Sequence, residues 1–159
     1  MEKIVFLEHK KYVKYVVDAI NGATVSVDVA MYKCALPGNY QKSAYTPIAE
    51  AIETAIKKGV GCRFLLCRME PDTGVSATNW ATTQWLKRIG AEVRRLVSRA
   101  CLHTKFIIVD SNEIIVGSHN WSGNTYDSTV DVSVAIKGYG VADQAAGFFN
   151  SLWSKSKEC

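Results

Sequence analysis

The sequence lacks several patterns that would place it in other classes of protein. None of its five cysteines forms a C-x-x-C pair, the spacing that many zinc sites use, and an odd number does not suit a disulfide framework. No apolar run approaches the roughly 18 residues of a membrane-spanning helix. The stretch after Met1 is too short for a signal peptide. We therefore expect reduced thiols, no metal, no cofactor and no membrane anchor, in a cytoplasmic protein.

What the sequence does contain is typical of a globular protein. Its 159 residues, of which 48% are hydrophobic and 21% charged, suit a single domain over residues 1–159 with a sizeable core. The formal net charge is +4. That mild excess suits a polyanionic partner without requiring one.

Strand and helix patterns alternate along the chain. The expected strands are 3–8, 24–32, 61–67, 91–97, 105–110, 113–118 and 130–136, and the expected helices are 9–22, 46–59, 79–90 and 141–155. Thr46 is a plausible N-cap, with Pro47 at the first helical position. This order predicts an α/β fold, a mixed sheet with helices packed on both faces.

Two stretches, 33–45 and 68–77, fall outside this alternation. Each follows a predicted strand directly, and functional loops in α/β sheets favour the ends of strands. Ordinary surface loops are an equally good interpretation of either one.

Residues 101–110, CLHTKFIIVD, carry the first chemical signal. Alternate side chains of a strand share a face, so His103 and Lys105 should point the same way. Asp110 lies seven positions from His103, an odd offset. We therefore expect it to have a structural role, such as fixing a turn.

A second group of polar residues follows in GSHN and the next strand. Gly117 permits close backbone approach, and Ser118 and Asn120 offer a hydroxyl and an amide to phosphate oxygens. Asp131 could accept a proton from His103 and so fix the tautomer of the imidazole. Together these groups predict a phosphodiester site without a metal.

The spacing His103-x-Lys105-x4-Asp110, followed by Gly117-Ser118-x-Asn120, resembles the signature of the phospholipase D superfamily. The resemblance implies that one histidine attacks phosphorus and forms a phosphohistidine. A second histidine would protonate the leaving oxygen and later activate water. Lysine, serine and asparagine would stabilise charge on the phosphate oxygens.

This chain carries one copy of a motif that family enzymes use twice. His9 lacks the surrounding motif residues, and His119 occupies the variable position of Gly117-Ser118-x-Asn120. We interpret both as surface histidines. The resemblance to the short, single-motif nuclease branch of the family implies a C2 homodimer whose active site combines two chains.

Nucleic acid is the expected substrate, with DNA or RNA left open. Basic residues could contact phosphates and aromatic residues could stack on bases, although the arginines could equally be solvated and Trp121 could pack below the loop. The alternatives are a phospholipid (cardiolipin-type) phosphodiesterase and a catalytically silent nucleic-acid-binding domain. The candidate substrate contacts are Lys33, Tyr40, Lys42, Tyr45, Arg94, Arg95, Arg99 and Trp121.

Overall fold

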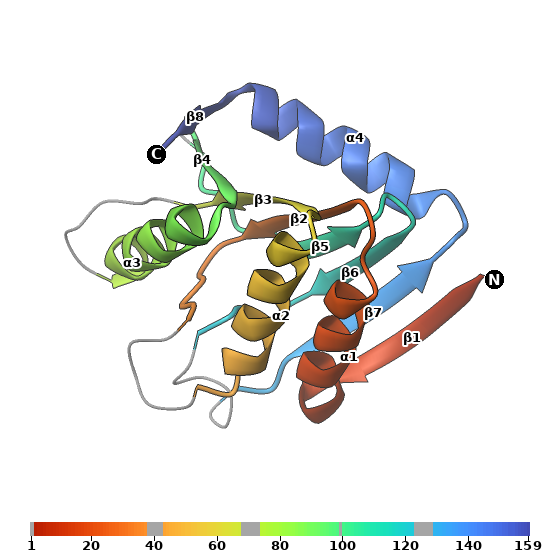
Figure 1. Ribbon diagram of the computed structural model, residues 1–159. Coiled ribbons are helices and arrows are strands. Elements are labelled where there is room, and N and C mark those ends of the chain that lie inside the picture. Colours follow the sequence, from red (N-terminus) through yellow and green to blue (C-terminus); the bar gives the residue numbers. More distant parts are fainter. Residues whose placement is uncertain (1, 38–42, 68–73, 99, 123–128) are drawn as a thin grey trace.

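The chain forms a layered structure around one eight-stranded sheet (Figure 1). The computed structural model describes residues 2–37, 43–67, 74–98, 100–122 and 129–159. Within these ranges, none of the helices has both the length and the apolar composition needed to cross a membrane. The strands are β1 (Lys3–Glu8), β2 (Ser26–Met31), β3 (Gly61–Leu66), β4 (Glu92–Leu96), β5 (Lys105–Val109), β6 (Glu113–Gly117), β7 (Val132–Lys137) and β8 (Ser156–Glu158). The helices are α1 (His9–Asn21), α2 (Thr46–Lys57), α3 (Gly74–Ile89) and α4 (Val141–Ser154).

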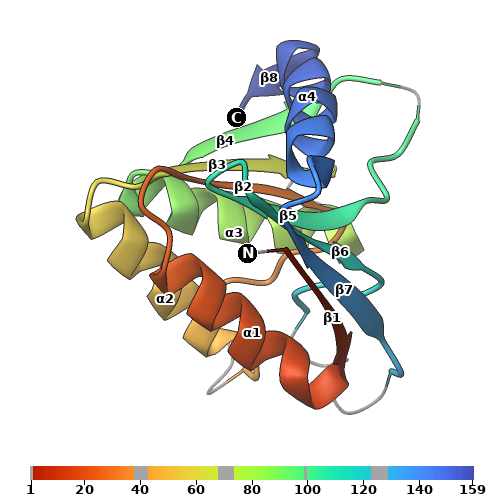
Figure 2. The same cartoon turned by 90° about the vertical axis from the view of Figure 1, so that its right-hand side faces the viewer.

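The strand order is β1-β7-β6-β5-β2-β3-β4-β8, with β2, β3 and β4 parallel and the other pairs antiparallel. Helices α1, α2 and α3 cover one face and α4 the other (Figure 2). In β5, Ile107 and Val109 pack beneath α1–α3, while Phe106 and Ile108 pack beneath α4. The predicted mixed sheet with helices on both faces is therefore confirmed.

A partly buried ion pair ties α4 to the sheet. Asp28 of β2 accepts two hydrogen bonds of 2.7 Å from the guanidinium of Arg63, its neighbour on β3. The same guanidinium lies 5.0 Å from the Phe149 ring and 5.3 Å from the Trp153 ring, both on α4. Because the pair is bidentate and stacked on aromatic rings, it fixes where α4 crosses the sheet.

The predicted boundaries agree with the structure to within two residues, apart from three differences. Helix α3 begins at Gly74, so residues 74–77 are helical and do not belong to a loop. Tyr45 is the N-cap of α2, and Thr46 is its first helical residue. Strand β8 (Ser156–Glu158) was not expected, because three polar residues carry no apolar pattern.

Candidate active site

Four residues of the motif lie at one end of the sheet. Strand β5 runs antiparallel to both β2 and β6, so its first residues lie beside the last residues of these two neighbours. His103 and Lys105 come from the start of β5, and Ser118 and Asn120 follow the end of β6. Two segments separated in sequence thus supply one polar cluster.

Tyr32, directly after β2, contacts both His103 and Lys105. The His103 ring is exposed and its centroid lies 4.7 Å from the Tyr32 ring, tilted by 58°. The Lys105 Nζ lies 5.1 Å from the same ring and donates a 2.7 Å hydrogen bond to the carbonyl oxygen of His103. Burial lowers the pKa of Lys105, and the charge of Asp131 acts in the opposite direction. The imidazole and the amine therefore share one aromatic platform.

Asp131 binds hydroxyl groups. One carboxylate oxygen accepts a 2.7 Å bond from Ser118 Oγ and the other a 2.6 Å bond from Thr129 Oγ1. Burial acts to raise the pKa of Asp131, but these two hydrogen bonds outweigh it and the pKa is lowered. The predicted hydrogen bond to His103 is not made within the described part of this single chain, in which the two hydroxyls are the hydrogen-bond partners of the carboxylate.

Asn120 joins the segment after β2 to the site. Its side-chain oxygen accepts a 3.2 Å bond from the Lys33 backbone N–H, and the Lys33 carbonyl accepts a 3.1 Å bond from the backbone N–H of Trp121. The Asn120 amide is thereby oriented, and its NH₂ group keeps two hydrogens to donate. Lys33 was a predicted substrate contact, and the structure places its backbone beside the site.

Trp121 is fully buried, and its indole N–H donates a 2.9 Å bond to the hydroxyl of Tyr12 on α1. The hypothesis that it stacks on bases is wrong, and the alternative of packing below the loop holds. Tyr45 is also buried, with 1% of its surface exposed, so it cannot stack on bases either.

His119 is buried, with 1% of its surface exposed, so its interpretation as a surface histidine is wrong. Its ring stacks on Tyr12 at 3.9 Å, and Nδ1 lies 2.8 Å from the hydroxyl of Ser133. Alternation with Ser118 and Asn120 turns it into the core beneath α1. Burial lowers the pKa of His119 to about 4, so the ring is neutral at pH 7. His9 is half-buried, with its ring 6.2 Å from that of His119.

Gly117 and Asp110 are the motif residues with structural roles. A Cβ on Gly117 would lie 2.2 Å from the carbonyl oxygen of Val132, so the predicted close backbone approach is confirmed. Asp110, at the far end of β5, accepts bonds of 2.8–3.0 Å from the backbone N–H groups of residues 24–26 and the Thr24 hydroxyl. Burial acts to raise the pKa of Asp110, but these bonds lower it. Such contacts are those of a structural residue.

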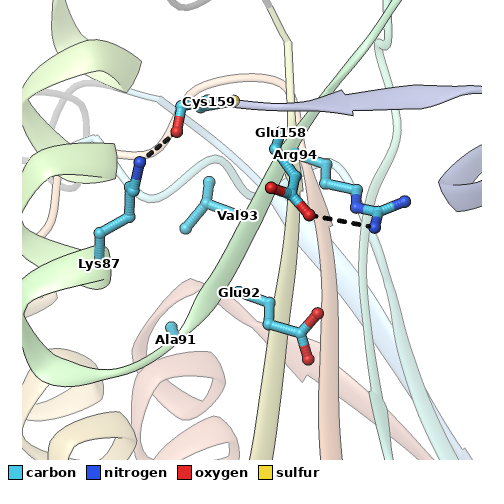
Figure 3. Close-up of a pocket in the computed structure, with 7 residues that line it drawn as sticks. All are labelled: Lys87, Ala91, Glu92, Val93, Arg94, Glu158 and Cys159. Atoms are coloured by element: carbon cyan, nitrogen blue, oxygen red, sulfur yellow. Dashed lines mark hydrogen bonds and ion pairs between the residues drawn. The ribbon is translucent and has the colours of Figure 1, made fainter.

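The predicted basic contacts are only partly near this cluster. Arg94 is on β4, which β2 and β3 separate from β5. Its guanidinium lies 4.7 Å from the Trp153 ring and 3.6 Å from Glu158, at a pocket of about 200 Å³ between α3, β4 and β8 (Figure 3). Arg95 is exposed and lies opposite Lys157 in the antiparallel register of β4 and β8. The structure therefore does not bring Arg94 to His103. Three further candidates, Tyr40, Lys42 and Arg99, lie outside the described residues.

Sequence reasoning missed two features of the site. Tyr32 closes the predicted strand 24–32, and an aromatic residue at that position was a usable signal. The close approach of Cys67 and Cys101, 34 positions apart, had no signal in the sequence. Among the residues that the structure describes, no three His, Cys, Asp or Glu side chains are grouped to hold a metal ion.

The family model described as "Cardiolipin synthase, PLD-like domain" matches residues 16–153. The chain therefore belongs to the phospholipase D superfamily. A curated relative, "Phospholipase D Y" from Dictyostelium discoideum, is 28% identical in an alignment of 131 positions that covers 76% of this chain. The chain spans only 29% of the length of that relative.

Two solved structures share the fold over the whole chain. NucT from Helicobacter pylori has a TM-score of 0.82 at 16% identity and is covered completely. Nuc from Salmonella typhimurium, a phospholipase D family member, has a TM-score of 0.80 at 19% identity and is covered over 97% of its length. At these identities the likeness establishes the fold alone.

Proposed function

We propose that this chain is a metal-independent nuclease that cleaves DNA or RNA through a phosphohistidine on His103. The observation that carries the proposal is the grouping of His103, Lys105, Ser118 and Asn120 at one end of the sheet. Full-length similarity to the short proteins Nuc and NucT supports a place in the single-motif nuclease branch. The proposal takes residues 1–159 as one domain, since all described strands join one sheet.

In the proposed reaction, an imidazole nitrogen of His103 attacks phosphorus. A nitrogen–phosphorus bond forms, a phosphorus–oxygen bond breaks, and His103 of the partner subunit gives its proton to the leaving oxygen. That second imidazole then takes a proton from water, which attacks phosphorus and releases His103. Lys105 and the Asn120 amide stabilise the equatorial oxygens. Ser118 joins them by turning its hydroxyl hydrogen from Asp131 to the phosphate.

The second histidine requires a second copy of the chain, and one surface fits that copy. Helix α4 packs on one face of the sheet but does not cover that face near the edge strand β1 (Figure 2). Phe6 and Val116 both pair with Val134 across adjacent strands, so they share this face. The open apolar face, as we call it, consists of Ile4, Phe6, Val116, Val132 and Phe148, which are 38–64% exposed.

The open apolar face adjoins the catalytic cluster. Val116 directly precedes Gly117-Ser118, and Val132 directly follows Asp131. A contiguous exposed apolar surface marks an interaction site. Pairing two copies through this face would bury it and bring the two His103 side chains toward one phosphate.

Hydrolysis assays in excess EDTA test the activity. Plasmid, single-stranded DNA, RNA and a chromogenic phosphodiester should be cleaved, and His103→Ala and Lys105→Ala should lose at least about 1,000-fold in rate. Lys57→Ala, at an exposed i,i+4 pair with Glu53 on α2, is the matched control and should keep full activity. A strict requirement for Mg²⁺ would refute the mechanism.

Subunit mixing tests the shared site. Equal amounts of wild-type and His103→Ala chains, allowed to exchange, should retain roughly one quarter of the wild-type activity, because only pairs of two wild-type chains are complete. One half would remain if each chain had its own site. Phe6→Lys should give monomers in light scattering and lose activity, whereas Val25→Lys, at an equally exposed valine outside the open apolar face, should do neither.

A phospholipid phosphodiesterase is the second candidate. The description of the matching family model as cardiolipin synthase and the name of the curated relative favour it. Turnover of cardiolipin vesicles, with every nucleic acid left intact, would select this function. Tight nucleic-acid binding without turnover, unchanged in His103→Ala, would instead indicate a silent binding domain.

A further inference from the structure

Two thiols lie against each other beside the proposed nucleophile. Cys67 follows β3 and is buried, and Cys101 is exposed in the segment that leads into β5. Their sulfur atoms are 3.0 Å apart and neither is in a disulfide. A disulfide requires a separation of about 2.05 Å, so a movement of about 1 Å would connect them.

The environment of this pair belongs to the site. Leu102, between Cys101 and His103, is buried in the same apolar cluster as Cys67. Burial lowers the pKa of Lys105, while the charge of Asp131 and the ionised forms of both thiols act to raise it. The thiols therefore lie within electrostatic reach of the amine that contacts Tyr32 and His103.

The other cysteines are less suited to oxidation. Burial raises the pKa of Cys34 and raises that of Cys62 to about 11. Burial also raises the pKa of Cys159, on the far side of the sheet beside Arg95. Because the thiolate is the reactive form, these three thiols react slowly at neutral pH. The exposed thiol of Cys101 is accessible and has a second sulfur in contact with it.

We propose that Cys67 and Cys101 are a redox-modification site, at which peroxide forms a disulfide that switches the active site off. The regulatory part of this inference rests on the proposed phosphodiesterase function. The Cys101 thiolate attacks one oxygen of hydrogen peroxide, which breaks the O–O bond, leaves a sulfenic acid and releases hydroxide that is protonated to water. The Cys67 thiol then attacks that sulfur and expels a second water. Two thiols lose two electrons and two protons, and one peroxide becomes two waters. A dithiol reductant reverses the reaction by exchange.

The disulfide acts on His103 through a short connection. Disulfide formation shortens the distance between the two sulfur atoms by about 1 Å. Cys101 and His103 both precede β5, and only Leu102 lies between them. A displacement of about 1 Å of a catalytic group can cost on the order of 100-fold in rate. We expect the oxidised protein to be about 10- to 100-fold less active than the reduced protein.

The experiment treats the full chain with hydrogen peroxide, quenches with catalase and divides the sample. Mass spectrometry of the unreduced digest should find the peptide pair linked through Cys67 and Cys101. Cleavage of the chromogenic phosphodiester should fall about 10- to 100-fold and recover after dithiothreitol. Cys159→Ser should behave like the wild type, and Cys101→Ser, a conservative change at an exposed position, should stay active in peroxide.

A third measurement does not depend on the activity. Diethyl pyrocarbonate labels accessible imidazoles, and the labelling rate of His103 should change several-fold between the reduced and oxidised proteins. If no substrate is cleaved, the proposed function fails while this rate still tests the disulfide. The redox proposal is overturned if no linked peptide forms. It is equally overturned if the link forms while neither the labelling rate of His103 nor any measurable activity changes. Inactivation of Cys101→Ser to the same extent as the wild type would also overturn it.

Discussion

Replacing Gly117 by alanine would test how closely β6 and β7 approach at the site. The added Cβ would lie 2.2 Å from the carbonyl oxygen of Val132, and 2.3 Å and 2.4 Å from Oγ and Cα of Ser133. Ordinary contacts of a Cβ begin at 3.4 Å. The two strands would have to separate by about 1 Å, and two of the three obstructing atoms are backbone atoms that cannot rotate away.

The cost can be worked out from these contacts. Overpacking of a well-packed position costs about 1–3 kcal/mol. The same opening strains the 2.9 Å bond from the Ser118 backbone N–H to the Val132 carbonyl, which contributes about 1 kcal/mol. We expect Gly117→Ala to lower the free energy of unfolding by about 2–4 kcal/mol. Because Ser118 moves with this strand, the rate of phosphodiester cleavage should also fall, by on the order of 100-fold.

Gly147→Ala on α4 is the matched control. It adds the same methyl group where nothing lies within 4 Å, inside a helix where alanine is preferred, so it should stabilise the protein by about 0.5–1 kcal/mol. Denaturant unfolding followed by tryptophan fluorescence measures both changes. A Gly117→Ala protein within about 0.5 kcal/mol of the wild type would refute the reasoning.

Three further predictions concern side chains around the site. His119 has a folded-state pKa of about 4, against 6.5 for an unperturbed histidine, so the unfolded chain gains a proton first. Stability should fall by about 3 kcal/mol as the pH drops from 6.5 to 4, and His119→Gln should lack that part of the slope in unfolding curves measured against pH. Asp110→Ala removes the acceptor of four hydrogen bonds and should cost about 2–3 kcal/mol in thermal melts, whereas Asp18→Ala at an exposed ion pair should change less than about 0.5 kcal/mol. A double-mutant cycle of Trp121→Phe and Tyr12→Phe should give a coupling of about 0.5–1.5 kcal/mol, and additive effects would contradict the buried hydrogen bond.

The sheet was predictable because its apolar residues alternate so regularly. The side chains of β5 divide between the two cores as period two requires. The start of α3 was not predictable, since its first buried residues, Ser76, Asn79 and Thr82, are all polar. The side chains of Asn79 and Thr82 accept hydrogen bonds from the backbone N–H groups of Cys34 and Leu36. A helix that uses polar groups to hold a neighbouring segment hides its own periodicity.

The spacing of the motif singled out four residues that lie at one end of the sheet, but it did not predict their contacts. Trp121 and His119 face the core because both contact Tyr12 of α1, through a hydrogen bond and a ring stack respectively. Helix α1 is more than 90 residues away in the sequence. The partner of Asp131 depended likewise on Ser118, which is 13 positions away in the sequence. Long-range packing of this kind has no local pattern, so only a three-dimensional structure could supply it.

The Asp110 clamp, as we call its hydrogen bonds to the backbone of residues 24–26, explains why four residues separate Lys105 from Asp110. They are the last four of the five residues of β5, which runs from the polar cluster at one end to the Asp110 clamp at the other. Deleting any one of them would leave either the amine or the carboxylate one position out of place, and would turn every following side chain toward the wrong core. An insertion in a surface loop leaves the distance between these two ends unchanged, whereas one residue added to β5 or removed from it alters that distance.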